Sequence, residues 1–214
     1  MQIQDEFSYD LVYSGINLLA GYQFTRLSER NLLVFNPEIG FGGIFNKGAG
    51  FAWEFKPVDI YYGYKARSDY FTAGAYITSN YHWQQYPELQ GCRLFWFSSI
   101  ELGPKVIFHL PYKSGFIKIV FSNSLAGFTS RPESQTETYF YSFDFSEFIS
   151  TSHRNLTFGS YNLFNHTNFE IEIENNRWNR ISFGYEFEYF GYYRDPGFSY
   201  LNHSLNVKLL IGKQ

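Results

Sequence analysis

Apolar and polar residues alternate with a period of two along much of the chain, and the spacing of amphipathic helices is nearly absent. The pattern is clearest at 179–189, where Ile181, Phe183, Tyr185, Phe187 and Tyr189 share one face. The other parity there is polar or glycine: Arg180, Ser182, Gly184, Glu186 and Glu188. Similar alternation at 139–146, 163–173 and 201–211 predicts β-strands with one apolar and one polar face.

Turn-forming residues divide the chain at nine places and so predict ten strands. The expected ranges are 11–26, 31–45, 50–65, 69–85, 92–110, 115–128, 137–148, 156–173, 178–193 and 199–212. The count stays open between about eight and twelve, because 129–155 is either a strand with two turns or one long loop. Pro57 and Pro104 lie within expected strands and predict β-bulges, since proline cannot donate to a ladder.

The composition indicates which solvent surrounds these strands. Aromatic residues make up 22% of the chain and charged residues only 17%, while the mean hydropathy is −0.29. A soluble protein with so many rings needs more charge to cover them, whereas a membrane barrel places one apolar face toward lipid and one polar face toward its lumen. No run approaches 18 consecutive apolar residues, so a transmembrane helix is not expected. Hydrocarbon otherwise admits only closed barrels.

We therefore predict an all-β fold for the whole chain, 1–214: a single closed, antiparallel, up-and-down transmembrane β-barrel of about ten strands in a bacterial outer membrane. No signal segment is recognised, so a mature chain after signal-peptide removal is expected. Aromatic residues near the turns are expected to form interfacial girdles. They are Tyr61, Tyr62, Tyr64, Tyr81, Trp83, Tyr86, Trp178, Tyr192 and Tyr193. The alternative is a soluble calyx or sandwich, which would need a polar outer face.

The polar parity places many charges inside the barrel: Glu38, Glu54, Lys56, Arg93, Glu101, Lys105, Lys118, Glu170, Glu172, Arg180, Glu186, Glu188 and Lys208. Side chains fill barrels of this size, and unpaired charges there cost several kcal/mol each, so we expect an ion-paired plug. The alternative is a narrow solute path lined by Glu170, Glu172, Glu186 and Glu188. A hairpin at 175–176 predicts that Glu172 opposes Arg180 and that His166 opposes Glu186.

Two short stretches resemble active-site motifs of the outer-membrane phospholipase A family. The first comprises Asn165, His166, Thr167 and Asn168, similar to H-x-S-N, and also resembles lipid A deacylase barrels. The second comprises Asn176, Arg177, Trp178, Asn179 and Arg180, similar to S-W-N-R. The resemblance implies lipid hydrolysis with His166 as base and Asn179 as orienting amide. The serine position holds Asn168, and strand alternation puts His166 in the lumen but Thr167 and Asn179 outside.

The remaining composition narrows the function classes. A net charge of −3 without a basic tract argues against nucleic acid as a partner. The five histidines lack metal-ligand spacing, so neither a metal nor a cofactor is expected, and the single cysteine, Cys92, cannot form an intrachain disulfide.

We predict a structural or accessory subunit of an envelope complex with an occluded polar lumen. Its partners would be outer-membrane lipid (phospholipid and lipopolysaccharide) and other envelope proteins, with exposed chemistry on the loops at 129–137 and 149–155. A lipid hydrolase and a narrow solute channel are the alternatives.

Overall fold

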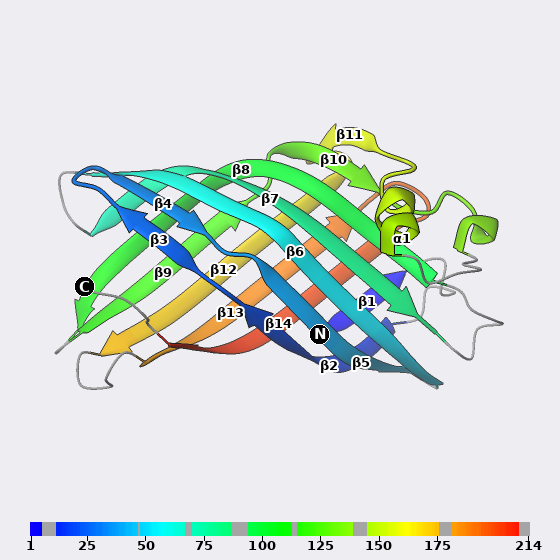
Figure 1. The fold of residues 1–214 in the computed structure, drawn as a ribbon, viewed down its shortest axis with the longest axis horizontal. Coiled ribbons are helices and arrows are strands. Elements are labelled where there is room, and N and C mark those ends of the chain that lie inside the picture. Colours follow the sequence, from blue (N-terminus) through cyan, green and yellow to red (C-terminus); the bar gives the residue numbers. More distant parts are fainter. Residues whose placement is uncertain are drawn as a thin grey trace.

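In the part of the chain that the computed structural model describes, fourteen antiparallel strands make up a single sheet. Figure 1 shows their arrangement. The structure describes residues 1–5, 12–46, 48–66, 70–86, 94–112, 115–138, 145–175 and 181–209. Ten of the strands form a hydrogen-bonded ring. In order around it they are β1 (Gln2–Asp5), β2 (Val12–Gly21), β5 (Glu38–Asn46), β6 (Gly48–Lys65), β7 (Phe71–Gln85), β8 (Leu94–Tyr112), β9 (Gly115–Asn123), β12 (Phe164–Asn175), β13 (Ile181–Tyr192) and β14 (Phe198–Leu209).

Four short strands extend this ring. They are β3 (Phe24–Leu27), β4 (Asn31–Phe35), β10 (Ala126–Ser130) and β11 (Thr157–Ser160). β3 pairs with β4 and β4 with β6, while β10 lies between β8 and β11. The all-β, antiparallel prediction is confirmed, and the ring is compatible with the predicted barrel. None of the described helices is long and apolar enough to cross a membrane.

One of the ten predicted strands is wrong, four are each divided into two strands, and one observed strand was not predicted. The described parts of 137–148 are helical: they belong to a 3-10 helix (Gln135–Thr138) and to α1 (Phe145–Thr151). β10 pairs directly with β11, so no sheet edge is left for a strand between them, and tertiary pairing overrides the local alternation. The unpredicted strand is β1, which is too short to show a periodic pattern.

The predicted register of the β12–β13 hairpin is also wrong. Glu172 lies opposite Gly184 and His166 lies opposite Phe190, four positions from the prediction. The reason is a longer connection, since β12 ends at Asn175 and β13 begins at Ile181. The shift is even, so every side chain still faces the predicted side of the sheet.

The two strand prolines behave differently. At Pro57 the β6–β7 register shifts between Phe55 and Val58, which confirms the predicted bulge. Pro104 does not cause one, because it pairs in unbroken register with Ala75 of β7. On the opposite edge of β8, the strand that pairs with it changes from β10 to β9 between Leu102 and Lys105. The hydrogen-bond ladder is therefore interrupted at Pro104, which has no N–H to donate.

Buried aromatic side chains gather at the end of the ring where β8, β12 and β14 begin and β13 ends. The ribbon shows α1 at this end (Figure 1). This aromatic cluster includes Tyr13, Tyr86, Phe95, Phe97, Phe164, Phe190, Tyr192, Phe198 and Tyr200. The girdle prediction is therefore wrong for Tyr86 and Tyr192, and also for Tyr61, which is buried in a second interior cluster. Neighbouring residues on a strand face opposite sides, so Tyr62 is exposed beside buried Tyr61. Tyr64 and Tyr193 are exposed as well, and Trp178 lies outside the described residues.

The segment that contains α1 packs against the outer wall of β7 and β8. Trp83 Nε1 donates to Ser152 Oγ at 3.0 Å, and the Tyr81 hydroxyl lies 2.9 Å from His153 Nε2. Ser98 Oγ also donates to the carbonyl of Ser152. Residues 149–155, predicted as a loop, include the last turn of α1 and cover two residues predicted for a girdle, Tyr81 and Trp83, which are both buried.

We expect Ser152→Ala to loosen this segment. The change removes the acceptor of the buried Trp83 N–H, and a hydrogen bond of this kind contributes about 1 kcal/mol. Urea unfolding in detergent micelles measures the loss. Ser150→Ala on the same segment is the control, because Ser150 Oγ donates only to the nearby Glu147 carbonyl on an exposed helix surface. Equal effects of the two changes would contradict the assignment.

Candidate functional site

A network of paired polar side chains crosses the middle of the ring, and His166 lies at the centre of this network. His166 projects inward from β12 and is buried, with Glu101 on one side and Glu188 on the other. Nδ1 lies 2.8 Å from Glu101 Oε2, and Nε2 lies 3.0 Å from Glu188 Oε1. Both ring nitrogens are thus engaged by carboxylates, which orients the imidazole and compensates the buried charges.

Glu101 is held by one further donor from its own strand, β8, and one from the neighbouring strand β7. Asn80 Nδ2 donates to Glu101 Oε1 at 3.2 Å, and Ser99 Oγ donates to the same oxygen. All three side chains are almost fully buried. Carboxylates that accept several hydrogen bonds tolerate burial, so the Glu101 carboxylate is satisfied in the interior.

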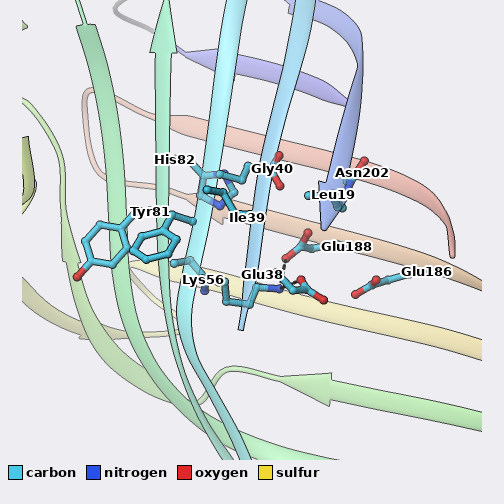
Figure 2. Close-up of a pocket in the computed structure, with 13 residues that line it drawn as sticks. Leu19, Glu38, Ile39, Gly40, Lys56, Tyr81, His82, Glu186, Glu188 and Asn202 are labelled. Atoms are coloured by element: carbon cyan, nitrogen blue, oxygen red, sulfur yellow. Dashed lines mark hydrogen bonds and ion pairs between the residues drawn. The ribbon is translucent and has the colours of Figure 1, made fainter. Parts of the chain in front are cut away.

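At its other end the network opens into a small pocket of about 20 Å³ (Figure 2). Lys56 lies at the centre, with Nζ 3.3 Å from Glu38 Oε2 and 3.9 Å from Glu188 Oε1. Glu186 and His82 also line the pocket. Polar and charged groups therefore converge on one space inside the ring, where the carboxylates of Glu38, Glu54, Glu186 and Glu188 surround the single lysine.

A second ion-paired group lies near the start of β9 and near the ends of β12 and β14. Glu172 Oε2 accepts from Lys118 Nζ and Lys208 Nζ, both at 2.9 Å. Lys208 also contacts Glu170, and Ser182 Oγ donates to Glu172. These charges compensate one another within hydrogen-bond distance, as buried ion pairs require.

The structure separates the residues that sequence reasoning grouped together. Glu170 and Glu172 belong to the lysine-paired group, whereas Glu188 belongs to the His166 network. Glu186 accepts from Asn168 and, at 3.2 Å, from Asn206. Arg180, Arg93 and Asn179 lie outside the described residues.

Asn80 and Ser99, which donate to Glu101, were not among the predicted site residues. The signal for Asn80 is present in the sequence. Thr78, Asn80, His82 and Gln84 alternate with Ile77, Ser79, Tyr81 and Trp83 on one strand. Charge alone does not identify Asn80 or Ser99 because both side chains are neutral.

The arrangement around His166 is unsuited to nucleophilic catalysis. A catalytic base needs a free ring nitrogen within hydrogen-bond reach of a hydroxyl, and both nitrogens of His166 face carboxylates. The nearest hydroxyl in sequence, Thr167, interacts with Asn123 and Asn165 instead. Among the described residues, no group of three or more His, Cys, Asp or Glu side chains is placed to hold a metal ion.

Comparisons with known proteins do not relate this site to a known family. No protein-family model, no curated protein and no solved structure matches the chain. The site is therefore interpreted from its own contacts.

Proposed function

We propose that the chain is an integral outer-membrane β-barrel with an occluded polar lumen, and that its role is that of a structural or accessory subunit of the envelope. One observation supports this most directly: large apolar side chains are exposed on the outside of the ring while charges pair on the inside. The exposed group includes Phe41, Leu102, Phe108, Phe121, Phe128, Phe158, Phe183 and Leu205. Soluble monomers rarely expose such extensive apolar surface, and a hydrocarbon environment accounts for it.

The membrane assignment predicts that outward positions contact acyl chains. With Cys92 replaced by serine, a bimane fluorophore on Leu102→Cys, which is 53% exposed, should be quenched by lipids brominated on their acyl chains. The same fluorophore on Glu147→Cys of α1 should not be quenched, because charged helical surface belongs in water or headgroups. Absence of quenching at Leu102 in the folded, reconstituted protein would contradict the membrane assignment.

The filled interior favours a closed barrel over a solute channel. The aromatic cluster occupies one end, and the His166 and Glu172 groups occupy the middle and the other part of the interior. Barrels of this strand number are filled by side chains. We therefore expect no unitary conductance steps in planar bilayers at protein amounts for which a porin, the positive control, gives clear steps. Reproducible steps from the unsubstituted protein would favour the channel instead.

The lipid-hydrolase alternative rests on the local resemblance around 165–168 and 176–180. The contacts of His166 disfavour it, since hydrolysis requires a free base beside a nucleophile. The expected result is that purified protein releases no fatty acid from phospholipid or lipid A. The proposal of a non-enzymatic barrel would be overturned by lipid turnover that His166→Ala abolishes, provided that the gel mobility of this variant shows it to be folded.

A further inference from the structure

A second pocket lies at the end of the ring that contains the aromatic cluster, between the loop that follows β10 and the turn that joins β13 to β14. Its volume is about 210 Å³, whereas the pocket beside Lys56 measures about 20 Å³. A water molecule needs roughly 10–15 Å³ of such space. The pocket beside Lys56 is therefore no larger than a water site, and the second pocket has room for a small organic molecule.

The wall of the second pocket contains a buried arginine. Arg131 is 4% exposed, and its guanidinium carbon lies 5.5 Å from the centroid of the Tyr192 ring and 6.0 Å from that of the Phe198 ring. Both rings belong to the aromatic cluster. Ring faces attract a guanidinium and fix its plane, and the N–H groups in that plane match the two oxygens of a carboxylate. Arg131 is therefore a well-oriented positive group in the wall of a cavity.

Hydrogen bonds of its own fix the loop that carries Arg131. Asn155 Nδ2 donates to the Arg131 carbonyl at 2.9 Å and to Glu137 Oε2 at 2.8 Å. The backbone N–H of Glu133 donates to the same Glu137 oxygen at 3.0 Å. Asn155 also lines the pocket. The pocket is thus built by an ordered loop, which lowers the entropic cost of binding a ligand.

The rim of the pocket carries charges of both signs. Glu133, Arg194 and Asp195 line the pocket and are exposed. None of these three side chains forms an ion pair with any part of the chain that the structure describes. With Arg131, the lining has two positive and two negative groups, so its formal charges cancel. A simple anion meets two carboxylates here and a simple cation meets a buried guanidinium, so the lining suits a ligand with one charge of each sign.

We propose that this pocket binds a small zwitterion, namely an α-amino acid with an apolar side chain. The carboxylate of the ligand pairs with Arg131, where the exclusion of water strengthens a charge-assisted hydrogen bond. The ammonium group lies at the rim beside Glu133 and Asp195. Pro132, which is buried, and the Tyr192 ring provide apolar surface for the side chain. Such a site adds a ligand to the proposed envelope role and does not depend on the membrane location.

Equilibrium dialysis of radiolabelled L-leucine against the folded protein in detergent micelles tests the site, with protein-free micelles as the blank. L-Leucine should bind above the blank. Leucinamide, which lacks the carboxylate, should compete at least about tenfold less well than unlabelled L-leucine, because the charge-assisted hydrogen bond to Arg131 is lost. N-acetyl-leucine, which lacks the ammonium group, should also compete less well than L-leucine.

Three variants assign these preferences to residues. Arg131→Gln should remove the preference for L-leucine over leucinamide. The double variant Glu133→Gln/Asp195→Asn, in which both changes lie on the exposed rim, should keep that preference but lose the preference for L-leucine over N-acetyl-leucine. Arg26→Gln is the control, because it removes one positive charge from the exposed strand β3 and should leave the affinity for L-leucine within about twofold.

Heat-modifiable gel mobility first shows which variants are folded. The proposal would be overturned if folded, unsubstituted protein bound no L-leucine above the blank. Equal competition by N-acetyl-leucine and L-leucine would overturn it too, because the pocket would then be a site for simple anions. So would an unchanged preference for L-leucine over leucinamide in folded Arg131→Gln. If Arg131→Gln does not fold, the competition series and the rim variant still decide, and a failure to bind in micelles counts against this site and not against the barrel.

Discussion

Replacement of His166 by leucine is expected to lower the free energy of unfolding by about 3–5 kcal/mol. The imidazole lies between Glu101 and Glu188, and the Glu101 side chain is completely inaccessible to solvent. Leucine has a similar volume, so the loss arises mainly from the two carboxylates and not from a cavity. Glu188 keeps Lys56 at 3.9 Å, whereas Glu101 keeps only neutral donors, Asn80 and Ser99. Urea unfolding in lipid vesicles provides the measurement.

Two variants separate the loss of charge pairing from a general effect of substitution. Adding Glu101→Gln to His166→Leu should recover a large part of the loss, because the uncompensated buried charge is then removed. His203→Leu is the matched control: it lies on the exposed outer face of β14, where we expect a change within about 1 kcal/mol. A His166→Leu loss no greater than that of His203→Leu would contradict the buried network.

The side of the sheet that each residue faces was predictable from the sequence, because it depends only on strand parity. Glu172 and Glu188 face inward and Phe183 faces outward, even though the hairpin register was wrong by four positions. Parity survives any even shift. It does not determine cross-strand neighbours, so the pairing of His166 with Glu101, 65 residues away, was not predictable.

Long-range pairing also explains the elements that sequence reasoning missed. The strand predicted at 137–148 does not fit between its neighbours in the sequence, since Thr129 of β10 pairs directly with Thr157 of β11. β1 is a strand only because β2 and β14 lie on both sides of it. Local alternation reports the preference of a segment, and the availability of an edge decides whether a strand forms.

Truncation of Phe97 to alanine is expected to destabilise the protein by about 3–5 kcal/mol, the range for emptying a packed aromatic position. Phe97 is 2% exposed and projects inward from β8 into the aromatic cluster. Its ring lies 4.4 Å from that of Phe190 and stacks on that of Phe198 at 5.0 Å between centroids. Three strands therefore meet at this one side chain, and the surrounding rings are fixed to the wall, so the cavity cannot collapse completely.

Two controls show whether this cost comes from the interior packing of the ring. Phe121→Ala removes an equally large ring from the outer face of β9, where lipid can fill the space, so only the transfer contribution of about 1.5–3 kcal/mol is lost. Phe97→Leu keeps most of the volume and should cost less than about 1.5 kcal/mol. Urea unfolding in the same vesicles gives all three values. Since the outer face is proposed to contact lipid and the inner cluster to close the lumen, a loss at Phe121 that equals or exceeds the loss at Phe97 would mean that the packed side of this wall is the outer one.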